Sequence, residues 1–207
     1  MDKELVNILK NKKFQWALAI VILVAVLVWS SHIRTTNWEL LTDQTTGEKI
    51  PLALDPFYFL RISEEIIENE GSLPEYDMMR YPSNPGGYSK EILPRAVLFL
   101  WKTGNFFGEY TLKEVNVFSP VVFYIIGLVM FFMLGYVLTK SKSAAAISSI
   151  FLAFVPSYLY RTMAGFSDHE AIGIMAFFVA MLIFTLSFKY LDKSKNLLYI
   201  GVFGAFN

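Results

Sequence analysis

The residues best suited to chemistry in this sequence are acids in two short motifs, Asp55-Pro56 and Asp168-His169-Glu170. Carboxylate oxygens with one imidazole nitrogen beside them form a ligand set that suits Mg²⁺ or Mn²⁺. Side chains two residues apart do not share a face of a helix, but they point the same way in an extended chain. Asp168 and Glu170 can therefore converge on one cation only if Asp168 precedes a helix.

The same acids also fit helix starts that hold no ligand. Ser167 with Glu170 matches a capping box, in which Ser167 is the N-cap and Glu170 the third helical residue. Asp55 can cap a helix in which Pro56 takes the first position. A cap and a metal site do not exclude each other, so each motif alone leaves both interpretations open.

Two further side chains lie near the second motif. Arg161 precedes Asp168 by seven residues. It is either an anchor at the membrane surface or a cation that steadies a carboxylate or contacts a phosphate. His169 is either a polar residue at a membrane edge or a contact for a ligand.

The composition indicates a membrane protein. Of the 207 residues, 55% are hydrophobic, and they cluster in runs. The formal net charge is zero, which gives no reason to expect a nucleic-acid partner. The absence of cysteine excludes disulfides, thiolate catalysis and cysteine-ligated zinc.

The apolar runs predict several membrane-spanning helices. The first run follows Lys10, Lys12 and Lys13, and its length favours an uncleaved anchor over a signal peptide. We expect the chain to be the N-terminal part of a longer protein, because its last run is too short to cross a bilayer. The expected spans are residues 14–31, 115–139, 144–160 and 171–188, with the start of a fifth at 197–207.

The placement of lysines predicts the orientation of these spans. Lysines cluster in three flanks, which we expect to be cytoplasmic: residues 1–13, 140–143 and 189–196. The segments 32–114 and 161–170 are then external, and each carries one acidic motif. The expected fold class is an all-α polytopic membrane protein with a long first external loop.

The external loop 32–114 is expected to contain short helices. The first begins at Asp55 and ends before Gly71, with an apolar stripe of Phe59, Ile62, Ile66 and Ile67. A second stripe at 92–101 predicts a helix along the membrane surface. Between them, the residues 80–87 are rich in proline, glycine and asparagine and indicate irregular backbone.

Both motifs resemble those of a known family. The string from Arg161 to Ala171 is similar to the second acidic motif of the catalytic subunit of oligosaccharyltransferase, the STT3/AglB family. That motif has an Arg, then a small residue and Gly, then Asp-x-Asp or Asp-x-Glu at the head of a transmembrane helix. The segment 55–61 resembles the family's first motif, and Asp77 to Pro82 resembles the stretch between the two.

The resemblance implies a GT-C-type transmembrane bundle and a glycosyltransferase. Such an enzyme transfers an oligosaccharide from a lipid-linked phosphate or diphosphate donor to the Asn of an Asn-x-Ser/Thr sequon. It implies that Asp55, Asp168 and Glu170 hold Mn²⁺ or Mg²⁺, and that Asp55 also faces the acceptor amide. Arg161 and His169 are the residues it offers for contact with the donor phosphate.

The implied partners are the lipid-linked donor, an acceptor polypeptide and membrane lipid. The implied location is the cell membrane, or a lumenal membrane face in a eukaryote. The family's later external Glu and its soluble C-terminal domain do not occur in these residues, so this part alone is expected to be inactive. Two alternatives stay open: another GT-C enzyme that uses a polyprenyl-phosphate sugar, and a non-catalytic membrane protein whose acids are only helix caps.

Overall fold

The computed structural model describes residues 11–77, 79 and 92–189. The regular structure of these residues is helical, without strands, as predicted. The chain divides into two compact units. The first comprises Met1–Arg34, Phe123–Tyr160 and Gly173–Asn207, and the second comprises Thr35–Val122 and Arg161–Ile172.

Three helices are long and apolar enough to cross a membrane, which confirms the membrane class. They are α2 (Lys12–Arg34), α5 (Leu112–Thr139) and α8 (His169–Lys189). A helix of this length that is apolar on most of its faces suits hydrocarbon better than a partly wet surface. The expected start of a fifth span lies outside the described residues, and the orientation of the spans stays a prediction.

The apolar run at 144–160 forms two helices, α6 (Lys142–Phe154) and α7 (Pro156–Arg161). The backbone turns extended at Val155, whose ψ is 125°. Pro156 explains the break, because proline has no N–H to continue the hydrogen-bond ladder and fits the first turn of a new helix. The break falls just before the segment that carries the second acidic motif.

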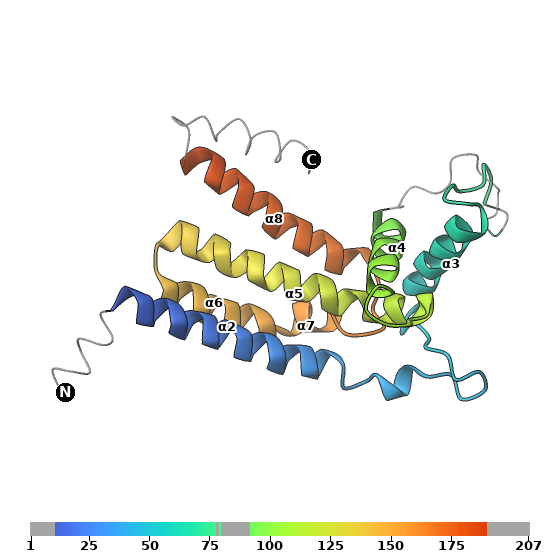
Figure 1. Cartoon of the computed structure of the whole chain (residues 1–207), viewed down its shortest axis with the longest axis horizontal. Helices are drawn as coiled ribbons and strands as arrows, with labels where there is room; N and C mark the ends of the chain where they lie inside the picture. Colours follow the sequence, from blue (N-terminus) through green and yellow to red (C-terminus); the bar gives the residue numbers. More distant parts are fainter. Residues whose placement is uncertain (1–10, 78, 80–91, 190–207) are drawn as a thin grey trace. The chain divides into compact units, whose positions relative to one another are not determined.

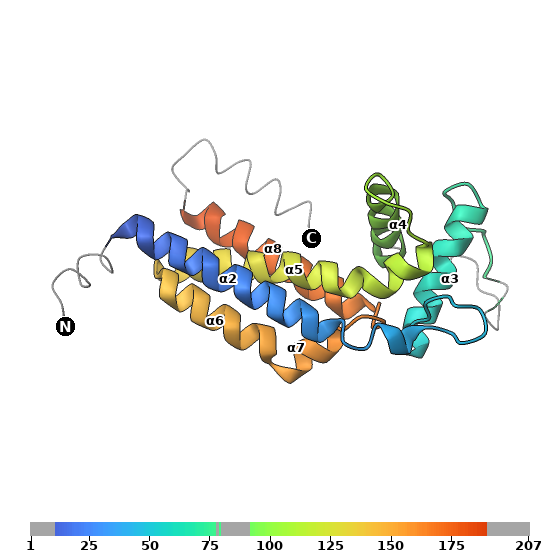
Figure 2. The ribbon, with the colours of Figure 1, turned by 60° about the horizontal axis from the view of Figure 1, so that its bottom comes forward.

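The first unit is held together by close helix packing. Helix α2 runs beside α6 (Figures 1 and 2). A Cβ on Gly135 would lie 3.5 Å from the Cα of Ala145, so small residues let α5 and α6 approach closely. At the end of α2, Arg34 is fully buried, with its guanidinium 3.5 Å from the Tyr124 ring centre and Nη2 donating to the Ala153 carbonyl at 3.0 Å.

The second unit contains the two short helices predicted for the external loop, α3 (Leu54–Glu68) and α4 (Ile92–Gly104). They pack against each other (Figure 2). Helix α3 ends as expected near Gly71, which has a φ of 100° and donates its N–H to the Ile66 carbonyl at 2.7 Å. The members of their shared core are Ile62, Ile66 and Leu98, with Tyr58, Leu73, Trp101 and Leu112 packed around them.

Two details of the loop prediction have different outcomes. Ile67 was assigned to the apolar stripe of α3 with Phe59, Ile62 and Ile66, but 42% of its surface is exposed. The proline- and glycine-rich residues 80–87 lie outside the described residues. A position of α4 along the membrane surface stays a prediction, which its exposed Ile92 and Phe99 suit.

Candidate metal centre

The start of α8 brings the second acidic motif to one point. Asp168 is the last residue before the helix, and only 4% of its surface is exposed. The backbone N–H of His169 donates to Asp168 Oδ1 at 2.6 Å, and His169 Nδ1 lies 2.5 Å from the same oxygen. With Asp168 ionised, Nδ1 carries the proton in this contact, and Nε2 is left as the acceptor nitrogen of the ring.

Three side chains of the motif converge. Asp168, His169 and Glu170 each offer one ligand atom, and these atoms all lie within 4.8 Å of one another. The two acids converge because α8 begins at His169, so Asp168 still belongs to non-helical backbone. This is the placement that their spacing requires if both are to face one cation.

Glu170 is held by Arg161 on one side only. Arg161 Nη1 lies 3.1 Å from Glu170 Oε1, and its guanidinium also lies 4.8 Å from the Phe166 ring centre. The other carboxylate oxygen, Oε2, is buried and has no hydrogen-bond partner in the described part of the chain. A buried carboxylate oxygen without a partner is costly, so this atom is ready for a ligand.

The capping-box interpretation of Ser167 and Glu170, which the sequence left open, is wrong. In that arrangement Ser167 would cap the helix and Glu170 would be its third residue, but α8 begins only at His169. The Ser167 hydroxyl lies 3.0 Å from the Ser119 hydroxyl, and the Glu170 carboxylate faces Arg161. Tertiary partners therefore take both side chains that local capping would have used.

The expected cap at Asp55 is also wrong. Helix α3 begins at Leu54 after the N-cap residue Ala53, so Asp55 lies in the first turn. Its side chain is exposed and has no hydrogen bond or ion pair among the described residues. A negative charge in the first turn still favours the helix dipole. Asp55 is thus free for other contacts.

Asp55 does not belong to the group of three converging ligands, but its helix touches them. Phe59 lies one helical turn after Asp55 and on the same face. The Phe59 ring centre is 6.3 Å from that of His169, with the two rings edge to face. The structure therefore brings the first turns of α3 to the start of α8.

Gly165 shapes the loop that leads to Asp168. Its φ is 89°, in the left-handed region that glycine adopts without strain. Its carbonyl accepts from the N–H of Leu52 at 2.9 Å, and its own N–H donates to the Val117 carbonyl at 2.8 Å. A Cβ at this position would lie 2.9 Å from Leu41 Cδ1. Only glycine fits both the backbone and the space.

The sequence from residue 13 to residue 206 matches the family described as oligosaccharyl transferase STT3, N-terminal. The chain belongs to this family. The membership confirms the resemblance seen in the two acidic motifs, and it covers nearly the whole chain.

The curated relatives of this chain include two archaeal glycotransferases. A dolichyl-phosphooligosaccharide-protein glycotransferase of Methanococcus voltae is 24% identical over 213 residues, which cover 92% of this chain and 23% of the relative. A second such enzyme, from Archaeoglobus fulgidus, is 25% identical over 163 residues, covering 77% of this chain and 26% of the relative. The chain thus spans about a quarter of the length of these relatives.

Solved structures confirm the expected GT-C-type fold. The archaeal oligosaccharyltransferase AglB of Archaeoglobus fulgidus, in complex with an inhibitory peptide and a dolichol-phosphate, has a TM-score of 0.79 at 20% identity, over 93% of this chain and 23% of that one. An Archaeoglobus fulgidus oligosaccharyltransferase in complex with zinc and sulfate has a TM-score of 0.76 at 21% identity, over 89% and 24%.

The residues at the start of α8 fit a divalent cation. Two carboxylates and an imidazole supply the oxygen and nitrogen donors that such ions take in proteins. The buried, partnerless Oε2 of Glu170 gains most from a cation, and the buried carboxylate of Asp168 offers a second oxygen close to it.

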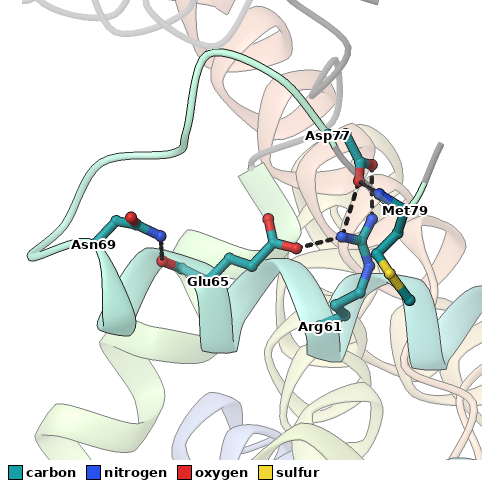
Figure 3. A network of polar contacts seen from close by, with 5 residues as sticks. All are labelled: Arg61, Glu65, Asn69, Asp77 and Met79. Carbon is teal, nitrogen blue, oxygen red and sulfur yellow. Dashed lines mark hydrogen bonds and ion pairs between the residues drawn. The ribbon is translucent and has the colours of Figure 1, made fainter. Parts of the chain in front are cut away.

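A second charged network lies on α3 (Figure 3). Arg61 Nη2 donates to Asp77 Oδ2 at 2.7 Å and Nη1 to Asp77 Oδ1 at 3.1 Å, and Arg61 also pairs with Glu65. The N–H of Met79 donates to Asp77 Oδ1 at 3.0 Å. This bidentate pair ties the chain after α3 back to the helix. The adjoining Arg80 to Pro82 lies outside the described residues.

Sequence reasoning missed two contacts of the site. Phe59 was assigned only to an apolar stripe, and Ser119 was not considered. Ser119 lies 48 residues from its partner Ser167, so no local pattern could pair them. A serine directly before a mid-helix proline was the one available signal.

Proposed function

We propose that this chain forms the metal-binding part of an oligosaccharyltransferase. The reaction is the transfer of a glycan from a lipid-linked phosphate or diphosphate donor to the Asn of an Asn-x-Ser/Thr sequon. The observation that carries the proposal is the convergence of Asp168, His169 and Glu170 at the start of an apolar helix, in a chain of this family.

In this proposal Asp168 and Glu170 bind Mn²⁺ or Mg²⁺ together with Asp55. A bound divalent cation supplies Lewis-acid stabilisation of the charge that develops on the leaving phosphate. The zinc in the Archaeoglobus fulgidus complex supports a divalent metal in this family. Oxygen-rich donors favour the two harder ions.

Asp55 has a second role in the proposal. It is exposed and uncommitted in the first turn of α3, and Phe59 links that helix to His169. A carboxylate in this place can accept a hydrogen bond from the acceptor amide N–H. That contact draws the nitrogen lone pair out of conjugation with its carbonyl and so favours attack on the sugar.

Arg161 and His169 are proposed to contact the donor phosphate. Arg161 binds Glu170 through one side of its guanidinium, and half of its side chain is exposed. Its remaining N–H groups can therefore donate to an anion. His169 is also about half exposed and keeps Nε2 available. The dolichol-phosphate and the inhibitory peptide in the Archaeoglobus fulgidus complex support such a donor and a peptide acceptor.

The proposal places the site on the external face of the membrane. The lysine-rich flanks predict a cytoplasmic N-terminus and an external start of α8. Three apolar helices of spanning length support a membrane location without fixing its direction.

Metal binding tests the proposal directly. We expect the purified protein in detergent micelles to bind Mn²⁺, measured by electron paramagnetic resonance (EPR), and Asp168→Asn and Glu170→Gln to weaken binding strongly. Asp43→Asn is the matched control, because Asp43 is a partly exposed acid of the same unit whose carboxylate accepts hydrogen bonds from its own turn, at Thr45 and Thr46. Equal Mn²⁺ binding by Asp168→Asn and Asp43→Asn would reject the metal site.

A transfer assay tests the reaction class. Membranes that contain a full-length protein in which this chain is the N-terminal part should transfer glycan from a polyprenyl-linked donor to a sequon peptide in a Mn²⁺-dependent way, and Asp55→Ala in that protein should abolish transfer. Transfer of a single sugar from a monophosphate carrier to a hydroxyl acceptor would instead support another GT-C enzyme.

A further inference from the structure

A buried pair of serine hydroxyls lies next to the acidic motif. Ser119 Oγ on α5 and Ser167 Oγ are 3.0 Å apart, and both residues are fully buried. Ser167 directly precedes Asp168. A buried hydroxyl needs a partner, so this contact fixes the backbone one residue before the proposed ligand.

Pro120 explains why the Ser119 hydroxyl donates a hydrogen bond to the backbone of α5. In a regular helix the N–H of residue 120 would donate to the carbonyl of Asn116, but proline has no N–H. The Ser119 hydroxyl lies 2.9 Å from that carbonyl oxygen and donates to it. Ser119 therefore replaces the hydrogen bond that Pro120 removes from α5.

The direction of the serine pair follows from counting protons. A hydroxyl donates one hydrogen bond and accepts up to two. Because Ser119 donates to Asn116, it can only accept from Ser167, and Ser167 is the donor of the pair. The chain of donation runs from Ser167 to Ser119 to the Asn116 carbonyl.

The loop before α8 has few other fixed points near Asp168. The carbonyl of Ala164 accepts from Asn37 Nδ2 at 2.9 Å, and Gly165 is held by Leu52 and Val117. These contacts lie three or four residues before Asp168. Within this loop, among the described residues, Ser167 makes the hydrogen bond to another element that lies nearest to Asp168.

We propose that Ser119 is a positioning residue for the metal site, which through Ser167 fixes the direction of the Asp168 carboxylate. This inference rests on the proposed metal-binding function. It adds a role for α5, which supplies no ligand itself. Side chains that hold metal ligands in place without binding the metal typically change metal affinity about 10–100-fold when they are mutated.

The proton count predicts an asymmetry between the two serines. Ser119→Ala leaves the Ser167 hydroxyl and the Asn116 carbonyl buried without a partner, so the loop must shift to satisfy them. Ser167→Ala leaves Ser119 bonded to Asn116, so its effect is smaller. In the double variant residue 167 has no hydroxyl, so no buried donor is left without a partner there.

The test measures Mn²⁺ affinity and the Mn²⁺ EPR line shape of the purified protein. We expect Ser119→Ala to lower the affinity about tenfold and to change the line shape. Ser167→Ala should lower it by a few-fold, and the double variant should bind no more weakly than Ser119→Ala. The matched control is Ser149→Ala, a buried helical serine that donates to Ala145 at 2.8 Å in the first unit; it should leave both readouts unchanged.

The possible failures are distinguishable. If Asp168→Asn also binds Mn²⁺ normally, the metal site itself is wrong. If Asp168→Asn loses binding while Ser119→Ala binds like Ser149→Ala, only the positioning role is overturned. Should Ser119→Ala not fold, as judged by circular dichroism, Ser167→Ala against Ser149→Ala decides, and equal affinities would overturn the role.

Discussion

The rings of Phe59 and His169 meet edge to face at 6.3 Å and connect the helix of Asp55 to the second acidic motif. Phe59 is 3% exposed, so its ring is fixed by packing, whereas about half of the His169 side chain is exposed. The contact gives the two motifs, more than 100 residues apart in sequence, a physical connection within one compact unit.

The first prediction concerns this contact. Phe59→Leu should lower the free energy of unfolding by about 1 kcal/mol, the value of an aromatic pair, and weaken Mn²⁺ binding severalfold by loosening Asp55. Phe57→Leu, two residues earlier and 47% exposed, is the control and should change neither quantity. Unfolding by SDS titration and Mn²⁺ EPR measure both. Unchanged affinity in Phe59→Leu would remove Asp55 from the ligand set.

Arg161→Gln should separate donor binding from stability. The ion pair with Glu170 is partly exposed, so its loss should change the unfolding free energy by less than about 1 kcal/mol. Loss of a charged donor to a phosphate should weaken binding of polyprenyl phosphate about tenfold. Donor titration at saturating Mn²⁺ checks this. A large loss of stability with normal donor binding would make Arg161 a structural residue only.

The sequence predicted the elements better than their partners. The long helices follow from runs of apolar residues, and α3 and α4 follow from stripes at helical spacing, because these signals are local. The cap at Ser167 failed because α8 begins only at His169, and the Ser167 hydroxyl bonds to Ser119 on another helix instead. The same limit applies to Glu170, whose carboxylate bonds Arg161 instead of the helix backbone.

The break between α6 and α7 shows a local signal that was available but was not used. Pro156 stands inside the apolar run at 144–160, and hydropathy alone does not register it. Ser119 before Pro120 is the same kind of signal, since a proline in a helix frees a carbonyl that a nearby donor must satisfy.

Glu64 on α3 should make stability depend on pH. Burial raises the pKa of its carboxyl, attraction to Lys113 opposes the rise, and repulsion from Glu68 and Glu48 adds to it. The pKa of Glu64 is higher in the folded protein than in the unfolded chain. At a pH above both values Glu64 is ionised in both states, and its charge then destabilises the folded protein. This cost disappears as the pH falls through the folded pKa towards about 4.3, the ordinary value.

Glu64→Gln should therefore be more stable than the parent protein at neutral pH, and the difference should vanish near pH 4. SDS titrations across this range measure it. Glu109→Gln is the control, an exposed glutamate of the same unit that does not contribute to the shift at Glu64. A benefit of Glu64→Gln that is the same at every pH would rule out titration as its cause.

The Arg61–Asp77 pair should be among the more important interactions for the stability of the second unit. Asp77 is 1% exposed, so removing its cation in Arg61→Ala should cost about 3–5 kcal/mol. Arg95→Ala is the control, since Arg95 is exposed and makes a 3.4 Å contact with the Gly71 carbonyl. Arg61→Ala combined with Asp77→Asn should recover part of the loss. A double variant as unstable as the sum of both single variants would contradict direct pairing.

Gly165 and Gly47 offer a matched pair that separates backbone strain from crowding. Both have positive φ, 89° and 73°, so alanine should cost about 1–2 kcal/mol of unfolding free energy at either position. A Cβ on Gly47 meets nothing within 4 Å, whereas one on Gly165 meets Leu41 at 2.9 Å and Leu52 at 3.1 Å. Gly165→Ala must therefore shift the loop that ends at Asp168, and it alone should weaken Mn²⁺ binding. Equal unfolding free energies and equal affinities in the two variants would show that the loop accommodates the methyl group without moving the carboxylate.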